Sequence, residues 1–499
     1  MQVFRRKMKV ILIDPPFERL MGIYNPFFPL GLGYLAAVCK AGGVDVQIYR
    51  ADIPSRGEKI KQEKNITSLQ LHHNYRQALE DENNFVWDEI RGRIMSFRPD
   101  LVGIQVMTPK LGSAKMVSRI TKRISKDILV VWGGPHPTLD PAGCLSDENV
   151  DILVRQEGEE TIKQLILCFQ RGAGREGING ISFRENGSIR HNPPQPLISD
   201  LDSIPFPSRE SLLKKELFYP EDFGDILISR GCPFCCAFCS SSGLWTRKVR
   251  RRSVENIIAE IRSIKKEFKT RIYKFHDDSF TLDRGLTISL CRAIIKEKLD
   301  IGWFCDTRLD LIDSELLSLM KKAGCLGINV GIESGSEKIL KYISKGIGIN
   351  AIKRGVALLN KSRLDWHAYF MIGFPPETEA DLKETVKLIK EIRPPAIVLS
   401  IFTPYPETDI FRELTENRAI STDIDWSKYS HHSPENAFIF GMDKDRFRAY
   451  VEEIACLVDR INHSPLSMVR KAMNRSDFYY RHPGALIKTA FTYLKRMRD

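Results

Sequence analysis

The alternation of short apolar runs with amphipathic stretches is the feature that most constrains the fold of this chain. It occurs in two blocks of the 499-residue sequence, and in each block a candidate strand is followed by a candidate helix and then by another strand. Parallel strands need such a helical crossover, because the chain must return to the same end of the sheet before the next strand begins. The sequence therefore predicts an α/β protein with sheets built mainly from parallel strands.

The first block, residues 1–190, predicts a doubly wound parallel sheet. Its candidate strands are residues 9–16, 44–52, 100–108, 128–138 and 150–158. Its candidate helices are residues 29–43, 85–97, 113–126 and 159–170, and a polar segment that runs to about residue 80 is predicted as an insertion. Ligands of such sheets bind beyond the carboxyl ends of the strands. We therefore expect one crevice to be lined by residues that follow these strands: Pro15, Thr108, Gly133, Gly134, Pro135, His136, Glu157 and Gly158.

A proline-rich stretch, residues 191–224, predicts a linker to the second block. The second block, residues 225–420, contains six candidate strands: residues 226–231, 272–278, 301–308, 327–335, 366–374 and 396–404. Six βα units fall short of the eight of a closed barrel, so we expect an open, partial (β/α)6 barrel of the TIM type. The alternation stops beyond residue 425, and residues 421–499 predict a small helical C-terminal region.

Composition narrows the class of protein. No apolar run approaches the roughly 18–20 residues that cross a bilayer. The apolar start of the chain ends at Asp14-Pro15-Pro16, which indicates a first strand and not a signal peptide. Eleven cysteines in a chain of this length, without a signal peptide, argue against a disulfide framework. We therefore expect a cytoplasmic protein.

Four cysteines lie within eight residues, Cys232, Cys235, Cys236 and Cys239. Thiolates are soft ligands that suit zinc or iron–sulfur clusters. A structural zinc site takes four ligands, commonly from two Cys-x2-Cys pairs, and no second pair exists elsewhere in the chain. A Cys-x3-Cys-x2-Cys triad on a cubane cluster leaves one iron without a protein ligand, and an open coordination site generally binds substrate. A non-catalytic iron–sulfur or zinc-binding protein remains the alternative.

This triad, with an aromatic residue before its third cysteine and at the end of the first strand of a partial barrel, resembles the radical S-adenosylmethionine superfamily. The resemblance covers about residues 225–415, and it implies a [4Fe-4S] cluster on Cys232, Cys236 and Cys239. The remaining iron would chelate S-adenosylmethionine, and one electron would break a sulfur–carbon bond to give a 5′-deoxyadenosyl radical. The residues implied to contact S-adenosylmethionine are Phe238, Asp278, Arg308, Glu333 and Ser334. Pro376 and Glu407 stand where the family often has glycine, so we assign no contacts to their turns.

The first block resembles the cobalamin-binding, Rossmann-like domain that precedes the barrel in many of these enzymes. The resemblance rests on the ordered motifs PP, PLGLGYLAA, DLVGIQ, VVWGGPHPT and VDILVRQEGEET in residues 8–170. It implies that cobalamin is contacted by the strand-end residues from Pro15 to Gly158 named above. The Asp-x-His-x-x-Gly motif that supplies a cobalt ligand in many cobalamin proteins is absent from the sequence. We therefore interpret His136 as a turn histidine and not as a cobalt ligand.

Together the resemblances imply a cobalamin-dependent radical enzyme that transfers a methyl group from methylcobalamin to an unactivated carbon, or to phosphorus. The alternative on the same scaffold is a radical cyclase or rearrangement enzyme. A small-molecule or lipid substrate is expected, with an electron donor such as flavodoxin or ferredoxin. The basic run at residues 247–252 predicts a charged loop before a helix that starts near Ser253, and no nucleic-acid partner is expected. Membrane-surface binding by the basic residues 485–498 is a less favoured alternative.

Overall fold

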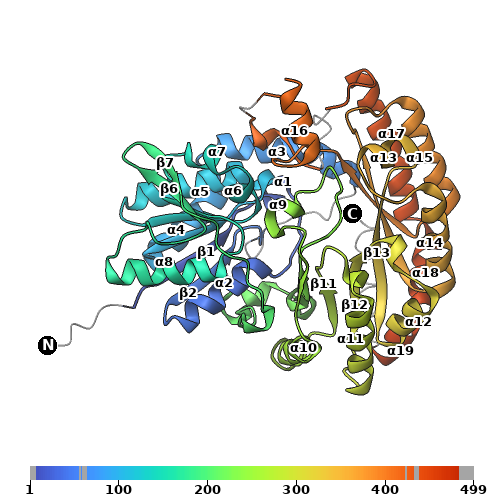
Figure 1. The fold of residues 1–499 in the computed structure, drawn as a ribbon, viewed down its shortest axis with the longest axis horizontal. Coiled ribbons are helices and arrows are strands. Elements are labelled where there is room, and N and C mark those ends of the chain that lie inside the picture. The colour runs from blue at the N-terminus through green and yellow to red at the C-terminus, as the bar shows by residue number, and fades with distance from the viewer. Residues whose placement is uncertain (1–6, 55–57, 59–64, 422–423, 432–437, 483–499) are drawn as a thin grey trace.

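The computed structural model describes residues 7–54, 58, 65–421, 424–431 and 438–482, and two sheets lie side by side in it (Figure 1). Within this part of the chain, the N-terminal sheet has seven strands in the order β2-β1-β3-β4-β5-β6-β7. The second sheet has six strands in the order β15-β14-β13-β12-β11-β8. Both predicted α/β units are therefore present, in the predicted chain order.

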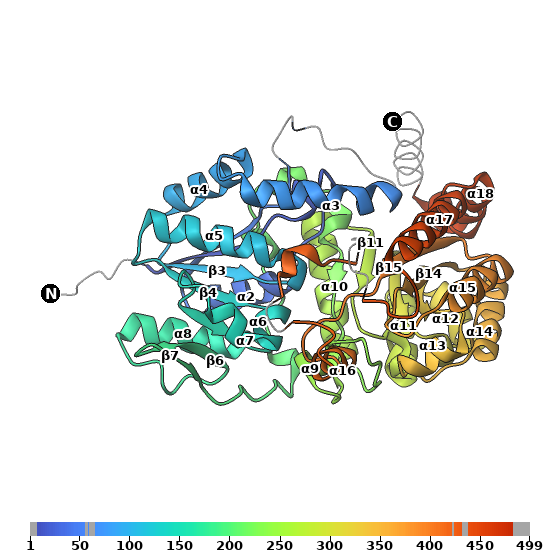
Figure 2. The ribbon, with the colours of Figure 1, turned by 90° about the horizontal axis from the view of Figure 1, so that it is seen from above.

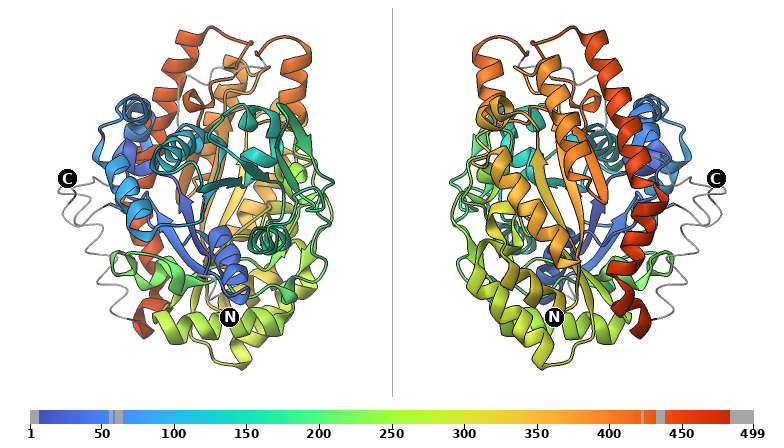
Figure 3. Two further views of the ribbon diagram at one scale, coloured as in Figure 1. Left: turned by 90° about the vertical axis from the view of Figure 1, so that its left-hand side faces the viewer. Right: turned by 90° about the vertical axis from the view of Figure 1, so that its right-hand side faces the viewer.

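The N-terminal sheet is doubly wound, as the sequence predicts. Its five parallel strands are β1 (Lys9–Asp14), β2 (Asp45–Arg50), β3 (Leu101–Gln105), β4 (Leu129–Gly133) and β5 (Ile152–Val154). Successive side chains of a strand face opposite sides, so Val10 and Leu12 enter one core while Ile11 and Ile13 enter the other. The helices that cover these two faces are α2 (Leu30–Ala41) with α8 (Glu159–Arg171), and α4 (Phe85–Phe97) with α5 (Leu111–Ile124) (Figure 3).

Two parts of this unit differ from the sequence prediction. Residues 65–80 of the predicted polar insertion form helix α3 (Asn65–Glu80). Strands β6 (Ile181–Glu185) and β7 (Ser188–His191) form an antiparallel hairpin that extends the sheet beyond β5. The hairpin escaped prediction because every residue of β7 is exposed, so this strand lacks the apolar–polar alternation by which a half-buried strand is recognised.

The second sheet is an open partial barrel of parallel strands. Its longer strands are β11 (Ile272–Phe275), β12 (Gly302–Thr307), β13 (Cys325–Glu333), β14 (Asp365–Ile372) and β15 (Ala396–Ile401). The helices on its outer face are α10 (Val254–Phe268), α11 (Arg284–Lys296), α12 (Ser314–Lys322), α14 (Ile349–Ser362) and α15 (Glu379–Ile392) (Figure 1). The edge strands β15 and β8 do not pair with each other, so the barrel stays open as predicted.

At the start of the barrel, two sequence predictions are wrong: the continuous strand at residues 226–231 and the charged loop at residues 247–252. The strand predicted at residues 226–231 is interrupted: β8 (Asp225–Ile226) joins the barrel, whereas β9 (Ser229–Arg230) pairs antiparallel with β10 (Arg250–Arg251). The basic run predicted as a charged loop therefore contains a short strand, and Arg250 and Arg252 are each only 5% exposed. They alternate with Arg251, which faces outward, because side chains of a strand alternate between its two sides. Ser253 caps the following helix α10, as predicted.

The C-terminal helices pack along the edge strand β15 and across the amino-terminal end of the barrel. These are α17 (Lys444–Asn462), α18 (Pro465–Asn474) and α19 (Ser476–Arg481). Phe478 of α19 packs with Leu326 and Phe304, and a β-carbon on Gly302 would lie 2.9 Å from its ring. Before these helices, Trp426 packs into the N-terminal core, so residues 424–431 lie between the two units (Figure 2). Residues 485–498, the predicted basic tail, lie outside the described part of the chain.

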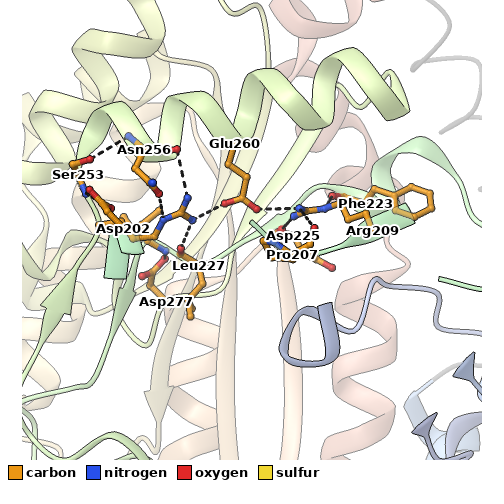
Figure 4. Close-up of polar contacts among 12 residues, drawn as sticks. Asp202, Pro207, Arg209, Phe223, Asp225, Leu227, Ser253, Asn256, Glu260 and Asp277 are labelled. Carbon is orange, nitrogen blue, oxygen red and sulfur yellow. Dashed lines mark hydrogen bonds and ion pairs between the residues drawn. The ribbon is translucent and has the colours of Figure 1, made fainter. Parts of the chain in front are cut away.

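The linker is fastened to α10 by a buried ion-pair network (Figure 4). Glu260 of α10 is fully buried and accepts hydrogen bonds from Arg209 of the linker at 3.0 Å and from Arg252 at 2.5 Å. Arg209 also donates to the backbone oxygens of Phe223 and Asp225, at 3.0 and 2.6 Å. A buried charge is costly unless it is paired in this way, so these contacts favour one path of the linker between the two units.

Candidate functional site

The four clustered cysteines lie in the loop between β9 and the short helix α9 (Ser241–Trp245). The loop begins at Gly231, whose φ of +103° is in the region that favours glycine. A β-carbon there would lie 2.4 Å from the backbone oxygen of Lys248, so a larger residue would force the backbone apart. The backbone of Ala237 is hydrogen-bonded to Ile343, which follows β13, and to Ile410, which follows β15. The loop therefore crosses the carboxyl edge of the barrel, where barrel active sites are built.

Three thiols of this loop lie close together. Burial raises the pKa of Cys232, Cys236 and Cys239. For Cys239 the pKa rises to about 11, and the charges of Cys236 and Cys232 contribute to the increase. Metal binding requires thiolates, so a cluster bound here must displace protons and neutralise the mutual repulsion of these groups. The three side chains predicted from the sequence are thus brought together, and they fit a cationic iron–sulfur centre.

Cys235 has different contacts. It is exposed, and its Sγ accepts a hydrogen bond from the Arg247 guanidinium. Among the residues that the structure describes, no three His, Cys, Asp or Glu side chains are placed to hold a single metal ion. A mononuclear zinc site needs three or four donors on one ion, whereas a cubane cluster spreads its thiolates over separate irons. The three thiols of the triad are thus placed as a cubane cluster, with one thiolate on each of three irons, would use them.

An ion pair stands beside this loop at the carboxyl end of β13. Glu333 has a φ of +67°, and its Oε1 accepts a hydrogen bond from the Lys345 ammonium at 2.7 Å. Both residues are 7% exposed. The pairing register of β13 shifts between Gly331 and Glu333, and a β-carbon on Gly331 would lie 2.4 Å from Oε1 of Glu333. The irregular strand end and the glycine together make room for this pair.

Arg308 connects the ion pair to the cysteine loop. Its guanidinium forms two hydrogen bonds of 2.9 Å with Asp310 and donates to the backbone oxygen of Lys345 at 2.9 Å. It also lies over the ring of Phe234 in the cysteine loop, 3.8 Å from the ring centroid. Arg308 and Glu333, which the sequence predicts from different strands, therefore meet at the loop that carries the three cysteines.

The other three predicted S-adenosylmethionine contacts have different surroundings. Asp278 is exposed and accepts a hydrogen bond of 2.7 Å from the first residue of α9. Phe238 is half-buried against Phe374, with 6.1 Å between the ring centroids. Ser334 is fully buried, and its hydroxyl lies 3.2 Å from that of Thr385 in α15. The Ser334 side chain thus faces the surrounding helix layer, which gives its predicted contact no geometric support.

The sequence prediction assigned no contacts to the turn after β15. Its residues Glu407, Thr408 and Asp409 line the same hollow as the four cysteines. A signal was present in the sequence, because Glu407 stands where the family often has glycine. Its φ of +62° lies in the region that glycine adopts without strain, which explains the usual residue at this position.

The predicted cobalamin contacts follow the carboxyl ends of β1, β3, β4 and β5. They are Pro15, Thr108, Gly133, Gly134, Pro135, His136, Glu157 and Gly158. The turn after β4 requires glycine, because Gly134 has a φ of +113° and a β-carbon would lie 3.2 Å from the backbone oxygen of Val106. Gly133, Gly134 and Pro135 remain partly exposed at this edge, so their backbone is open to a flat, bulky ligand.

His136 is fully buried next to this turn. Its Nδ1 lies 3.1 Å from the hydroxyl of Thr108. The ring of Trp426 packs edge-on against the imidazole, with 5.8 Å between the two ring centroids. Burial lowers its pKa to about 4, so the imidazole is neutral at pH 7. Trp426 covers one side of the ring, but Nε2 is buried without a hydrogen-bond partner among the described residues, so the role of His136 stays a prediction.

Glu157 has partners that the sequence did not indicate. It is 3% exposed, and both of its oxygens accept hydrogen bonds from Arg250, at 2.8 and 2.7 Å. Arg230 donates to it at 2.7 Å, and the backbone of Ile198 donates at 2.7 Å. Burial opposes ionisation, but the hydrogen bonds from Arg250 and the charge of Arg230 outweigh it and lower the pKa of the carboxyl. Since its oxygens are fully used, Glu157 joins the two units and has no free group for a corrin.

The two edges meet at two short helices. Helix α9 follows the cysteine loop, and helix α6 (Pro135–Leu139) begins in the turn after β4. A β-carbon on Gly243 of α9 would lie 2.7 Å from the side chain of Leu139, so the glycine allows close packing of the helices. The cysteine loop and the glycine-rich turn of the N-terminal sheet are therefore neighbours.

Comparisons with known proteins agree with this architecture. The family model of the radical SAM superfamily matches residues 226–389, and that of the B12 binding domain matches residues 22–166. An uncharacterised methyltransferase of Pyrococcus horikoshii is 31% identical over 494 residues, which are 97% of this chain and 95% of that protein. An anaerobic magnesium-protoporphyrin IX monomethyl ester cyclase of Rubrivivax gelatinosus is 30% identical over 361 residues, 70% of this chain and 64% of the cyclase.

A solved structure with the same fold is that of the radical S-adenosylmethionine methyltransferase TsrM from Kitasatospora setae. The TM-score is 0.67 with 17% sequence identity, and the match covers 84% of this chain and 79% of that chain. At this identity the similarity concerns the fold, and it includes both the N-terminal sheet and the partial barrel.

Proposed function

The chain belongs to the radical SAM superfamily, in the group with an N-terminal B12 binding domain, and we propose that it transfers a methyl group from methylcobalamin to an unactivated carbon or phosphorus of its substrate. It is a B12-dependent radical SAM methyltransferase whose cofactors are a [4Fe-4S] cluster, S-adenosylmethionine and cobalamin. When bound, these cofactors supply a radical that removes a hydrogen atom from the substrate and a methyl group that replaces it.

The observation that supports this proposal most directly is that the carboxyl edge of the N-terminal sheet and that of the barrel are in contact through α6 and α9. Gly243 follows the cysteine loop, Leu139 follows the glycine-rich turn, and the two helices touch. Radical formation and methyl donation need two large cofactors that face one substrate, and such a shared edge allows both to reach it while water is excluded.

The residues of the barrel edge have distinct roles in this proposal. Cys232, Cys236 and Cys239 hold the cluster. The Lys345 and Arg308 cations and the Glu333 carboxylate match the carboxylate and amino groups of the methionine moiety of S-adenosylmethionine. Phe238 and Asp278 flank the same loop, and we propose that they line the remainder of the cofactor site.

A radical cyclase or rearrangement enzyme is the second candidate. The specific observation in its favour is the 30% identity to the magnesium-protoporphyrin cyclase over 361 residues. The mass of the product separates the two candidates, because methyl transfer adds one CH2 to the substrate whereas cyclisation does not.

The test uses the full-length protein, reconstituted without oxygen with iron, sulfide and cobalamin and supplied with a reductant. With S-adenosylmethionine labelled in its methyl group and a pool of small molecules or lipids from the source cells, we expect 5′-deoxyadenosine, S-adenosylhomocysteine and a labelled product. Formation of 5′-deoxyadenosine without any S-adenosylhomocysteine would contradict methyl transfer. Cys232→Ala serves as the negative control, because it lacks a cluster ligand and should form no 5′-deoxyadenosine.

We also propose a small-molecule or lipid substrate and reduction of the cluster by an electron donor such as flavodoxin or ferredoxin in the cytoplasm. The position of the cysteine loop supports access for a donor, since Cys235, which lies within it, is exposed. Among the described residues, none of the helices has the length and apolarity needed to traverse a bilayer. Reduction of the cluster by purified flavodoxin, followed by electron paramagnetic resonance, tests this part.

A further inference from the structure

The residue that precedes the cysteine loop is buried in the N-terminal unit. Arg230 is 5% exposed, and its Nη1 and Nη2 donate to Glu157 at 2.7 Å and to Glu159 at 2.5 Å. Glu157 follows β5, and Glu159 begins α8. The cysteine loop, which belongs to the barrel, is therefore anchored at its start to the other half of the molecule.

The same arginine also contacts the end of the loop. Its guanidinium carbon lies 5.4 Å from the ring centroid of Tyr34 in α2 and 5.4 Å from that of Trp245, the last residue of α9. Cation–π contacts at such distances are favourable, and more so away from water. Arg230 thus holds both the strand before Cys232 and the helix after Cys239 against the N-terminal unit.

A second arginine completes the group. Arg250 of β10, paired with β9, donates through Nη1 to both oxygens of Glu157 and to the backbone oxygen of Ile198 at 2.7 Å. We call Arg230, Arg250, Glu157 and Glu159 the interdomain ion-pair cluster. It contains two cations and two carboxylates, so its formal charge is balanced, and each member is less than a tenth exposed.

We propose that the interdomain ion-pair cluster is a positioning device that sets the distance between the iron–sulfur cluster and cobalamin. The inference rests on the proposed function, because it assumes that the N-terminal edge holds cobalamin. Cleavage of S-adenosylmethionine needs only the barrel edge, whereas methyl donation needs both edges in register. A misplacement of about 1 Å can cost about 10²-fold in rate, so a fixed loop favours coupling of the two events.

A graded series of variants tests the proposal. Glu157 accepts hydrogen bonds from two arginines and Glu159 from one, so Glu157→Gln should have a larger effect than Glu159→Gln. Glu185→Gln is the matched control, because Glu185 pairs with Arg190 on the exposed β6–β7 hairpin of the same unit. The full-length chain is used in every case.

The first readout is pulsed dipolar electron paramagnetic resonance between the reduced cluster and cob(II)alamin in the reconstituted enzyme. We expect one narrow distance distribution for the wild type and for Glu185→Gln. For Glu157→Gln we expect a broadening of about 1 Å or more, the scale on which misplacement affects rate. An unchanged distribution in Glu157→Gln would overturn the proposal.

The second readout does not depend on cobalamin. Hydrogen exchange of the same chains should accelerate in Glu157→Gln at residues 226–245 and 152–166 together, while β13 keeps its wild-type protection. Acceleration across the whole chain, or none at all, would show that the carboxylate has only a general structural role and would overturn the proposal. If the wild type lacked a cob(II)alamin signal, the proposed function would fail, whereas the exchange result would still decide whether the ion-pair cluster holds the loop.

Discussion

Buried acidic side chains lie at the carboxyl edges of both sheets, but their partners differ between Glu377 of the barrel edge and two aspartates of the N-terminal edge. There Asp14 and Asp52 bind the ammonium of Lys110 at 2.7 and 2.8 Å. At the barrel edge Glu377, which is 0% exposed, accepts hydrogen bonds only from the backbone of Gly373 and Phe374 among the described residues, at 2.5 and 3.2 Å.

The ionisation of the two edges differs accordingly. Burial opposes the charge of Asp52, but Lys110 and Arg50 outweigh it and lower the pKa of this carboxyl. Burial raises the pKa of Glu377 to about 8, because the backbone hydrogen bonds and the charge of Lys338 do not outweigh it. The comparison teaches that a polar residue at a strand end is not by itself part of a site. At the N-terminal edge many such groups satisfy one another, whereas the barrel edge leaves its thiols beside a hollow.

Removal of one thiol should have the largest effect. In Cys232→Ala we expect the formation of 5′-deoxyadenosine to fall by at least about 10³-fold, because a cluster ligand is lost and little residual chemistry remains. Iron content and product are measured together after reconstitution. Cys235→Ala is the matched control and should retain activity within about twofold. Equal losses in both variants would contradict the assignment of the triad.

At the N-terminal edge, loss of Lys110 should lower the stability of the protein, because this lysine pairs with both Asp14 and Asp52. Lys110→Met leaves Asp14 and Asp52 buried without their common partner, so we expect the free energy of unfolding to fall by about 3–5 kcal/mol. Urea unfolding at pH 7 measures the change. Lys163→Met removes an exposed lysine paired with Glu160 and should change stability by less than about 0.5 kcal/mol. A similar, small change in both variants would show that the two aspartates do not depend on Lys110.

Glu377 should make the stability of the protein depend on pH in the opposite sense to a salt-bridged acid. The folded pKa of Glu377 is raised from 4.5 to about 8, so the folded state keeps a proton that the unfolded state has released, and its stability falls as the pH rises between these values. We expect Glu377→Gln to gain about 2–4 kcal/mol relative to the wild type between pH 5 and pH 8. Urea unfolding across this range measures the difference. A difference that stays constant with pH would show that Glu377 is ionised in the folded protein.

The smallest of these effects concerns the ion pair beside the cysteine loop. Glu333→Gln removes a charged hydrogen-bond partner, so binding of S-adenosylmethionine should weaken by about 1.5–3 kcal/mol, or roughly 10- to 150-fold. Titration calorimetry of the reconstituted protein measures the affinity. Glu315→Gln changes an exposed glutamate on α12 and should leave the affinity unaltered. Unchanged binding in Glu333→Gln would remove this residue from the proposed cofactor site.

Much of the fold and part of the site could be predicted from the sequence, because they depend on local patterns. The alternation of strands and helices, the cap at Ser253 and the grouping of Cys232, Cys236 and Cys239 are all local. The hairpin β6–β7 could not be recognised, since its outer strand buries no side chain. The role of Arg250 was missed because its partner Glu157 is 93 residues away in the chain. The role of Arg252 was missed because its contact with Glu260, eight residues further on, depends on how α10 packs over the preceding strand.

The sequence by itself determined that this chain has two α/β units and that three thiols stand at the start of the second, because periodicity and spacing are properties of consecutive residues. Only the tertiary structure decided which polar groups at the strand ends remain free to contact a cofactor and which are used in internal hydrogen bonds. Ser334 and Glu157 end or follow strands as predicted, yet one faces α15 and the other pairs with two arginines. The physical reason is that the desolvation of a charge, and the partner that offsets it, are set by residues distant in the chain.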